Sequence, residues 1–456
     1  MPICKRLSTL SVTPLALALL VSLAALPATA KVKLDAPAPL EWQPVHGKTT
    51  TEVVARLESQ HYRKQRFDDA MSTQLLESYL KSLDPARLFL LQGDIDGFAR
   101  YRSTLDDSIH AGDLEPSFVI FRRYQQRVIQ RLEKVLADLP ATVAAMDFTE
   151  DEFLELDRTK SPWPKTVTEA DELWRLRLKN SVLSLRLAGK KNDDIVKLLD
   201  RRHRNQLNRV MQYSGEDVFQ IYLNALSGLY DPHTNYLSPR TSENFNINMS
   251  LKLEGIGAVL QAEDEFTKVA RLVPAGPAAK QGELKTADRI VAVGEGNKGE
   301  MKDVIGWRLD DVVDLIRGPK GSLVRLEVIP AGAKSEEERR TIVITRNEVK
   351  LEEQSAQKRV LEIDNGNGRK SKIGVIDLPA FYIDFEAMRR GDPEFKSTTR
   401  DVQKLLSELM TENVDGVVID LRENGGGSLQ EANALTGLFI ESGPTVQIRH
   451  SSARVF

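Results

Sequence analysis

The sequence has almost no cysteine. The only one among its 456 residues is Cys4, which lies in a segment that is typical of a removable leader. Without Cys4 the mature chain would have no thiol, which excludes disulfides, thiolate catalysis and cysteine-ligated metal sites. The lack of a stray thiol also suits an oxidising compartment.

Histidine is scarce and the charges are nearly balanced. The six histidines are scattered, with no His-Glu-x-x-His motif or other paired spacing of metal ligands. The formal net charge is -3 at pH 7, so the composition indicates no broad basic surface for nucleic acid. We therefore expect no metal, no other cofactor and no nucleic-acid partner.

Long apolar runs are also missing, apart from one at residues 14–26. Lys5 and Arg6 precede it, and Ala28-Thr29-Ala30 follows it. A positive start, a short apolar run and a small-residue cleavage pattern form a secretory signal peptide. The run is too short to span a membrane comfortably and no second run follows. We expect residues 1–30 to be removed, which leaves no stable membrane span.

The rest of the chain reads as a soluble globular protein, with 41% hydrophobic and 28% charged residues. Its length is too great for one hydrophobic core and indicates roughly three domains. A Pro-rich lead-in at 31–48 precedes a helical domain at 49–229. Apolar residues recur there at spacings of three and four: Phe118, Phe121, Val128, Leu132, Val135, Leu136 and Leu139.

The period of the apolar pattern changes after a turn-rich linker at 230–247, in which His233 has the setting of a structural residue. Residues 248–346 contain short β-type runs, at 256–260, 268–273, 289–293 and 324–329. An amphipathic helix at 309–316 separates the last two runs. A charged stretch at 334–340 indicates a hairpin loop. This pattern predicts a small sheet capped by one helix.

The last segment, 347–456, alternates strands and helices. We expect strands at 373–378 and 416–421, the second a buried parallel strand because its apolar run is nearly continuous. We expect helices at 395–410 and 429–440. A further strand is predicted at 445–448. This is an α/β layer.

A glycine-rich turn joins the strand at 416–421 to the next helix. It reads Asp420-Leu421-Arg422-Glu423-Asn424-Gly425-Gly426-Gly427-Ser428. Glycines permit positive φ and close backbone approach, and exposed amides at a helix start can hold an anion or a developing oxyanion. Neither a Walker lysine nor GxGxxG spacing is present to favour a phosphate site.

Taken together, these features resemble one family. The chain runs in the order signal peptide, helical domain, Asp-Pro-His-Thr-Asn-Tyr-Leu at 231–237, small β segment and glycine-rich turn. This order is similar to that of the tail-specific proteases, the C-terminal processing peptidases of bacterial envelopes. Leu253-Glu254-Gly255-Ile256-Gly257-Ala258 resembles the carboxylate-binding loop of a PDZ domain. Gly276-Pro277-Ala278-Ala279 resembles its GPA turn. The sequence departs from the family at Ala287, where a glycine usually precedes Asp288.

The resemblance implies a multidomain α+β fold: an N-terminal helical domain, a PDZ-like small β domain with short helices, and the start of an α/β protease core of the crotonase or ClpP type. It implies that Gly255, Ile256, Gly257 and Ala258 bind the substrate tail, and that Gly426 and Gly427 form the oxyanion turn. The family's serine nucleophile and lysine base lie C-terminal to that turn, beyond Phe456. We therefore expect this chain to be a fragment that is inactive as given.

The resemblance also implies partners and a location. It predicts a serine endopeptidase that takes protein substrates with apolar C-terminal tails, with or without an adaptor protein. It places the enzyme in the periplasm, free or peripheral to the inner membrane. Two Ser-x-x-Lys patterns, Ser78 with Lys81 and Ser355 with Lys358, have no glycine-rich turn beside them and are not expected to be catalytic.

Two other functions stay open from the sequence. A non-catalytic PDZ-containing binding protein of the envelope would explain the small β domain, but it has no use for the glycine-rich turn. An acyl-CoA hydratase or isomerase would use such a turn, but its cytoplasmic chemistry conflicts with a signal peptide and a PDZ-like segment. Whether the reading frame continues past Phe456 would separate the protease from the binding protein.

Export can be tested directly. We expect the mature protein to begin at Lys31, because Ala28-Thr29-Ala30 fits the small-residue cleavage rule. N-terminal sequencing of the protein from the periplasmic fraction measures this. Soluble protein that retains Met1 would contradict the prediction.

Overall fold

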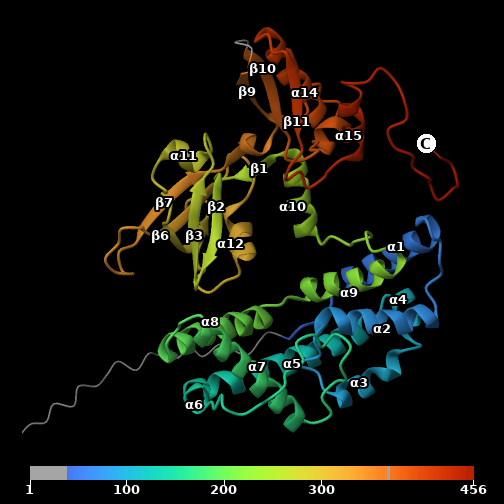
Figure 1. Cartoon of the computed structure of the whole chain (residues 1–456), viewed down its shortest axis with the longest axis vertical. Helices are drawn as coiled ribbons and strands as arrows, with labels where there is room; N and C mark the ends of the chain where they lie inside the picture. The colour runs from blue at the N-terminus through green and yellow to red at the C-terminus, as the bar shows by residue number, and fades with distance from the viewer. Residues whose placement is uncertain (1–38, 365, 367–369, 456) are drawn as a thin grey trace, which may run out of the picture. The chain divides into compact units, whose positions relative to one another are not determined.

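The computed structural model describes residues 39–364, 366 and 370–455 (Figure 1). The predicted signal peptide with its cleavage site and Cys4, and residues 31–38 of the predicted lead-in, therefore lie outside the described residues. In the part that is described, no helix combines the length and the apolar character that a membrane crossing needs.

The N-terminal part is helical, as predicted. It is the blue-to-green part of Figure 1 and contains α1 (Pro44–Gln60), α2 (Asp69–Leu83), α3 (Gln92–Phe98), α4 (Leu105–His110), α5 (Glu115–Ala137), α6 (Leu139–Ala144), α7 (Val167–Leu187), α8 (Asn192–Met211) and α9 (Gly215–Tyr230), with a 3₁₀ turn at Ala99–Tyr101. Apolar side chains of α1, α2, α5 and α9 share one buried core, including Val54, Leu75, Tyr79, Phe118, Tyr222 and Leu226.

Two helix boundaries correct the sequence analysis. Helix α1 begins at Pro44, inside the segment 31–48 that we expected to be a loose lead-in. Proline suits the first helical position, because its ring presets φ and its missing N–H has no partner there. The linker 230–247 also contains most of a helix, α10 (Pro239–Ser250). Ser238 caps it by accepting the N–H of Thr241, and Pro239 again stands at the first position.

The small β domain follows the predicted pattern. Its main sheet is antiparallel, in the order β2 (Ala258–Glu263), β3 (Phe266–Leu272), β4 (Arg289–Glu295), β6 (Leu323–Ile329) and β7 (Arg340–Thr345), with β5 (Met301–Asp303) beside β4. Helices α11 (Pro277–Gln281) and α12 (Leu309–Ile316) complete it, and α12 has the predicted bounds. A separate pair, β1 (Lys252–Gly255) with β8 (Asn347–Lys350), is antiparallel.

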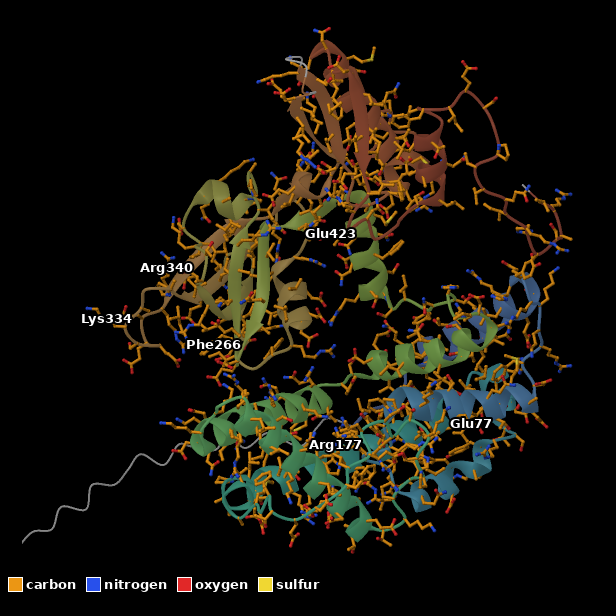
Figure 2. All side chains as sticks on the ribbon, in the orientation of Figure 1. Glu77, Arg177, Phe266, Lys334, Arg340 and Glu423 are labelled. Atoms are coloured by element: carbon orange, nitrogen blue, oxygen red, sulfur yellow. The ribbon has the colours of Figure 1, made fainter. Side chains whose placement is uncertain are left out.

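The first predicted strand of this domain starts too early. Strand β2 begins at Ala258, whereas the sequence predicted a strand from Ile256. Gly257 has φ +72°, which breaks the extended backbone and makes residues 256–257 a loop. The predicted hairpin loop connects β6 and β7, and Figure 2 labels Lys334 within it and Arg340 at its end.

The C-terminal part is an α/β layer. Its sheet has the order β11 (Gly416–Asp420), β10 (Lys370–Asp377), β9 (Gln357–Asp364), in which β10 and β11 are parallel and β9 is antiparallel. Its helices are α13 (Phe385–Arg389), α14 (Thr398–Thr411) and α15 (Leu429–Thr436), and a 3₁₀ turn at Glu352–Gln354 precedes β9. The predicted fold class, a helical region followed by a PDZ-like β domain and an α/β part, is confirmed.

Two expectations for this layer are wrong. Strand β11 was expected to be buried, but Val417 and Val418 are 39% and 50% exposed. It pairs with β10 along one edge, and no strand of the described residues lies on its other edge. The strand predicted at 445–448 does not form either. No described strand supplies hydrogen bonds to those residues, and without a partner an apolar run cannot become part of a sheet.

The family departure at Ala287 has a structural consequence. Ala287 has φ +70°, the left-handed conformation that glycine adopts without strain. Three contacts hold this turn: the Ala287 N–H donates to Val269 O at 2.8 Å, Asp288 Oδ2 accepts the Lys285 N–H at 3.0 Å, and Arg340 pairs with Asp288 at 2.9 Å. Residue 287 therefore keeps the left-handed conformation typical of glycine, although the alanine side chain disfavours that conformation.

We predict that Ala287→Gly stabilises the small β domain. The left-handed conformation costs an alanine about 1–2 kcal/mol, and part of that is recovered on substitution. A gain of ~1 kcal/mol should slow amide hydrogen exchange in β3 and β4 about fivefold, measured by mass spectrometry. The matched control is Gly282→Ala at the end of α11, where φ is +78° and no atom lies within 4 Å of the new Cβ. It should accelerate exchange, and equal exchange in both variants would contradict the strain at Ala287.

Candidate functional site

The predicted tail-binding loop, Gly255-Ile256-Gly257-Ala258, runs from the end of β1 into β2. Its carbonyl oxygens are used within the domain: Ala278 N–H donates to Ile256 O and Val273 N–H donates to Gly257 O, each at 2.8 Å. Because the C=O and N–H of one planar trans peptide point in opposite directions, the Gly257 and Ala258 N–H groups point away from these contacts. Among the described residues, the amides of Ile256 and Gly257 donate to no acceptor.

The GPA turn, residues 276–279, sets the position of this loop. A Cβ added to Gly257 would lie 3.0 Å from the Gly276 Cα, so the two backbones touch where neither carries a side chain. Gly257 also has φ +72°, which disfavours any larger residue. Two motifs that the sequence analysis singled out separately therefore form one structural unit.

Strand β2 leaves one edge of the sheet open beside the loop. Among the strands of the described residues it pairs with β3 alone. Ile256, Val312 and Ile316 are buried in the core of this domain, and Ala258, Leu260 and Leu315 pack against it in part. An open strand edge beside a loop of open amides can accept an extended peptide with a terminal carboxylate.

Arg346, which the sequence analysis did not single out, fixes the C-terminal end of α12. Its side chain is 1% exposed. It donates from Nε to Ile316 O at 2.8 Å and from Nη2 to Leu315 O at 3.0 Å, and it pairs with both oxygens of Glu295 at 2.7 and 2.6 Å. Hydrogen bonding to Arg346 lowers the pKa of Glu295. A buried arginine after a strand has no local sequence signature, because its partners come from three distant segments.

The second predicted site is the glycine-rich turn between β11 and α15, in which Figure 2 labels Glu423. Asp420 at its start accepts hydrogen bonds from the backbone and side chain of Arg422, which lower the pKa of its carboxyl well below the usual range. Asn424 donates from Nδ2 to Leu378 O at 2.9 Å, and its Oδ1 accepts the Gly426 N–H at 2.8 Å. The aspartate and asparagine of the motif therefore shape the turn.

The structure distinguishes the two predicted oxyanion donors. The Gly426 N–H is bound by Asn424, whereas the Gly427 N–H donates to no acceptor among the described residues. The Gly426 carbonyl accepts the Phe381 N–H at 2.8 Å, so the Gly427 amide of the same peptide points away from Phe381. A Cβ on Gly427 would lie 2.3 Å from Phe381 O, and its φ is +139°. Only glycine fits at position 427.

The residues set aside in the sequence analysis have ordinary partners. His233 is exposed, and its N–H donates to Asp231 Oδ1 at 2.8 Å. Ser355 Oγ donates to Glu352 O at 2.8 Å, and Lys358 pairs with Glu412 and with Glu408. Hydrogen bonding to Glu412 raises the pKa of Lys358, which keeps the amine protonated and so unable to accept a proton.

Comparison with known families accounts for three segments of the chain. Residues 53–240 match the tail specific protease N-terminal domain, residues 244–329 match the PDZ domain, and residues 372–455 match peptidase family S41. These matches follow the order of the helical, β and α/β parts.

Individual proteins give the same picture. The chain is 39% identical over 408 residues to the Tail-specific protease of Haemophilus influenzae, which covers 89% of this chain and 55% of that protein. It is 31% identical over 224 residues to the carboxy-terminal processing protease CtpB of Bacillus subtilis, covering 49% of this chain and 40% of CtpB. One solved structure is the PDZ domain of the carboxy-terminal protease from Vibrio cholerae in complex with peptide. It is 48% identical to this chain, and the match spans 22% of this chain and 100% of that one, with a TM-score of 0.21.

The chain thus spans about half the length of the curated relatives it matches, and those relatives are named as proteases. The three family matches lie in the order that the motifs indicated. These matches confirm the resemblance of this chain to the tail-specific, C-terminal processing proteases that carry a PDZ domain.

Proposed function

We propose that this protein is an exported serine endopeptidase that holds its substrates by their C-terminal tails and cleaves them with a serine/lysine dyad. The observation that supports this most directly is the presence of two separate backbone turns with outward-pointing amides, one after β1 and one after β11. The first suits a stable carboxylate, and the second suits a charge that develops during reaction.

Tail recognition would use Gly255, Ile256, Gly257 and Ala258. The terminal carboxylate would accept hydrogen bonds from the amides of the loop, and the preceding residues would add as a strand to the open edge of β2. The last side chain would meet Leu260 and Leu315, which are only partly buried in the core, and this favours tails that end in apolar residues. Protein substrates with such tails are the proposed partners, delivered directly or by an adaptor.

Binding a tail would promote cleavage elsewhere in the same substrate. Once the tail is held, the rest of the substrate chain stays near the protease site at a high effective concentration. The enzyme therefore needs little affinity for the sequence it cuts. An unstructured substrate suits this mode, because it can reach the second site without unfolding.

In the catalytic step, the Gly427 amide would stabilise the tetrahedral oxyanion. The Gly426 amide is bound to Asn424, so Gly426 would act by positioning the turn. The nucleophile and base are those that the family resemblance places C-terminal to the turn: an unprotonated lysine would take the proton of the serine hydroxyl as the serine attacks the carbonyl. No cofactor is required by this mechanism.

The proposed location is the periplasm. A leader at residues 1–30 and a mature chain without cysteine both suit an oxidising compartment outside the cytoplasm.

Tail recognition predicts a strong dependence on the terminal charge. A peptide with a free, apolar C-terminus should bind this chain on the order of 100-fold more tightly than the same peptide with an amidated end, because amidation removes the charged acceptor. Fluorescence anisotropy titrations of the two peptides measure this ratio. Equal affinities would refute the assignment of the loop, whatever the protease activity.

The oxyanion proposal predicts that neighbouring glycines differ. In the protease that contains these residues, Gly427→Ala should lower casein cleavage by about 100-fold or more, because the new Cβ collides with Phe381 O and displaces the donor. Gly425→Ala is the control, since no atom lies within 4 Å of its Cβ and cleavage should stay near the wild-type level. Tail affinity should be unchanged in both variants. Full activity of Gly427→Ala would place the oxyanion site elsewhere.

A further inference from the structure

The glycine-rich turn after β11 has little rigidity of its own. A Cβ on Gly425 or Gly426 would meet no described residue within 4 Å, apart from chain neighbours. Glycine also loses more conformational freedom on folding than any other residue. The open Gly427 amide therefore keeps one direction only if contacts from outside the turn hold it.

Phe381 makes the contacts nearest to that amide. Its N–H donates to Gly426 O and its carbonyl accepts the Ser428 N–H, each at 2.8 Å. Phe381 and Gly427 thus pair as in two parallel strands, with one bond on each side of Gly427. The direction of the Gly427 amide depends on where the Phe381 backbone lies and on where α15 begins.

The N-terminal end of α14 holds the backbone beside Phe381. Thr398, the first residue of this helix, is completely buried. Its N–H donates to Tyr382 O at 3.0 Å, and its Oγ1 accepts the Tyr382 N–H at 2.7 Å. Both backbone polar groups of Tyr382 are therefore bound to one residue, which fixes the position of Phe381 next to it.

Glu431 ties the start of α15 to the same end of α14. It lies in the first turn of α15, three residues after Ser428, and is 4% exposed. Its Oε2 accepts the Ser397 Oγ–H at 2.7 Å and the Thr399 N–H at 2.8 Å. The first N–H groups of a helix have no acceptor within the helix, and a carboxylate is favoured there. One carboxylate therefore joins the starts of two helices.

We propose that Glu431 and Thr398 are positioning residues for the oxyanion turn. Thr398 holds the segment that contains Phe381, Glu431 holds the helix that begins after Ser428, and the Gly427 amide lies between these two attachments. This inference rests on the proposed function of that amide. An oxyanion donor acts only at hydrogen-bond distance from the developing charge, so a small displacement of the turn lowers the rate.

The first test is a set of variants at Glu431 and its neighbour in the active protease that contains this chain. Glu431→Ala should lower kcat for an internally quenched, apolar-tailed peptide by about tenfold or more, with KM and tail affinity unchanged. Glu431→Gln keeps an acceptor oxygen for Ser397 and Thr399 and should recover most of the loss. Gln430→Ala, at the exposed position next to it, is the control and should stay near the wild-type rate.

A double-mutant cycle with Gly427→Ala separates positioning from a plain loss of stability. If Glu431 acts through the Gly427 amide, Glu431→Ala should change kcat by no more than about twofold once Gly427→Ala has displaced that amide. A residue that only stabilises the fold would lower kcat by the same factor in both backgrounds. Such additivity would overturn the proposal.

Thr398 gives a second cycle that does not depend on Glu431. Thr398→Val is close in shape but lacks the hydroxyl that binds the Tyr382 N–H, so it should lower kcat in the wild-type background and have little effect beside Gly427→Ala. Thr398→Ser restores a hydroxyl and should recover most of the activity.

The outcomes separate this inference from the proposed function. Full activity of Gly427→Ala would show that the oxyanion assignment is wrong, and the inference would fall with it. If Gly427→Ala is impaired while Glu431→Ala and Thr398→Val cleave as fast as the wild type, the oxyanion assignment stands and the inference alone is overturned.

Discussion

Both candidate sites depend on one property of the peptide bond: its carbonyl and its amide point in opposite directions. In the loop after β1, Val273 and Ala278 bind the carbonyls of Gly257 and Ile256. In the turn after β11, Phe381 binds the carbonyl of Gly426. In each case the scaffold holds the carbonyl inward, and the following amide is left facing outward. In both sites, a hydrogen bond to the carbonyl of a peptide orients the N–H of the same peptide outward.

This construction explains why glycine is needed at both places. Gly257 touches the backbone of Gly276, and Gly427 lies against the Phe381 carbonyl, so neither position has room for a side chain. Both also have positive φ. Because the neighbouring backbone lies so close, a residue larger than glycine does not fit at either position. The same close packing lets that backbone bind the adjacent carbonyl and leave the amide open.

Two arginines near the C-terminal end of α12 have different partners. Arg346 is buried and fully paired, and it ties the end of α12 to Glu295 and to the helix carbonyls. Arg317, the first residue after α12, donates to Asn244 Oδ1. The paired arginine holds the C-terminal end of α12, whereas Arg317 meets a neutral amide oxygen.

The sequence alone determined the order of the domains, the helical character of the first and the bounds of α12, because these follow from local periodicity and motifs. It also located the residues of both candidate turns, since glycine-rich motifs are local. It missed α10, placed the start of α1 too late and predicted a strand at 445–448 that does not form. Strand formation needs a partner, which no local pattern contains.

Only the tertiary structure decided which amides are open. Gly426 and Gly427 are adjacent and chemically identical, yet Asn424 occupies the first amide and leaves the second open. The same holds for Ala287, whose left-handed conformation is imposed by Val269 and by the contacts of Asp288. Contacts with distant residues hold these turns: Leu378 orients Asn424, Phe381 binds the Gly426 carbonyl, and Val269 binds the Ala287 amide. The residue types alone could therefore name the sites but could not tell which atom in each is free to bind.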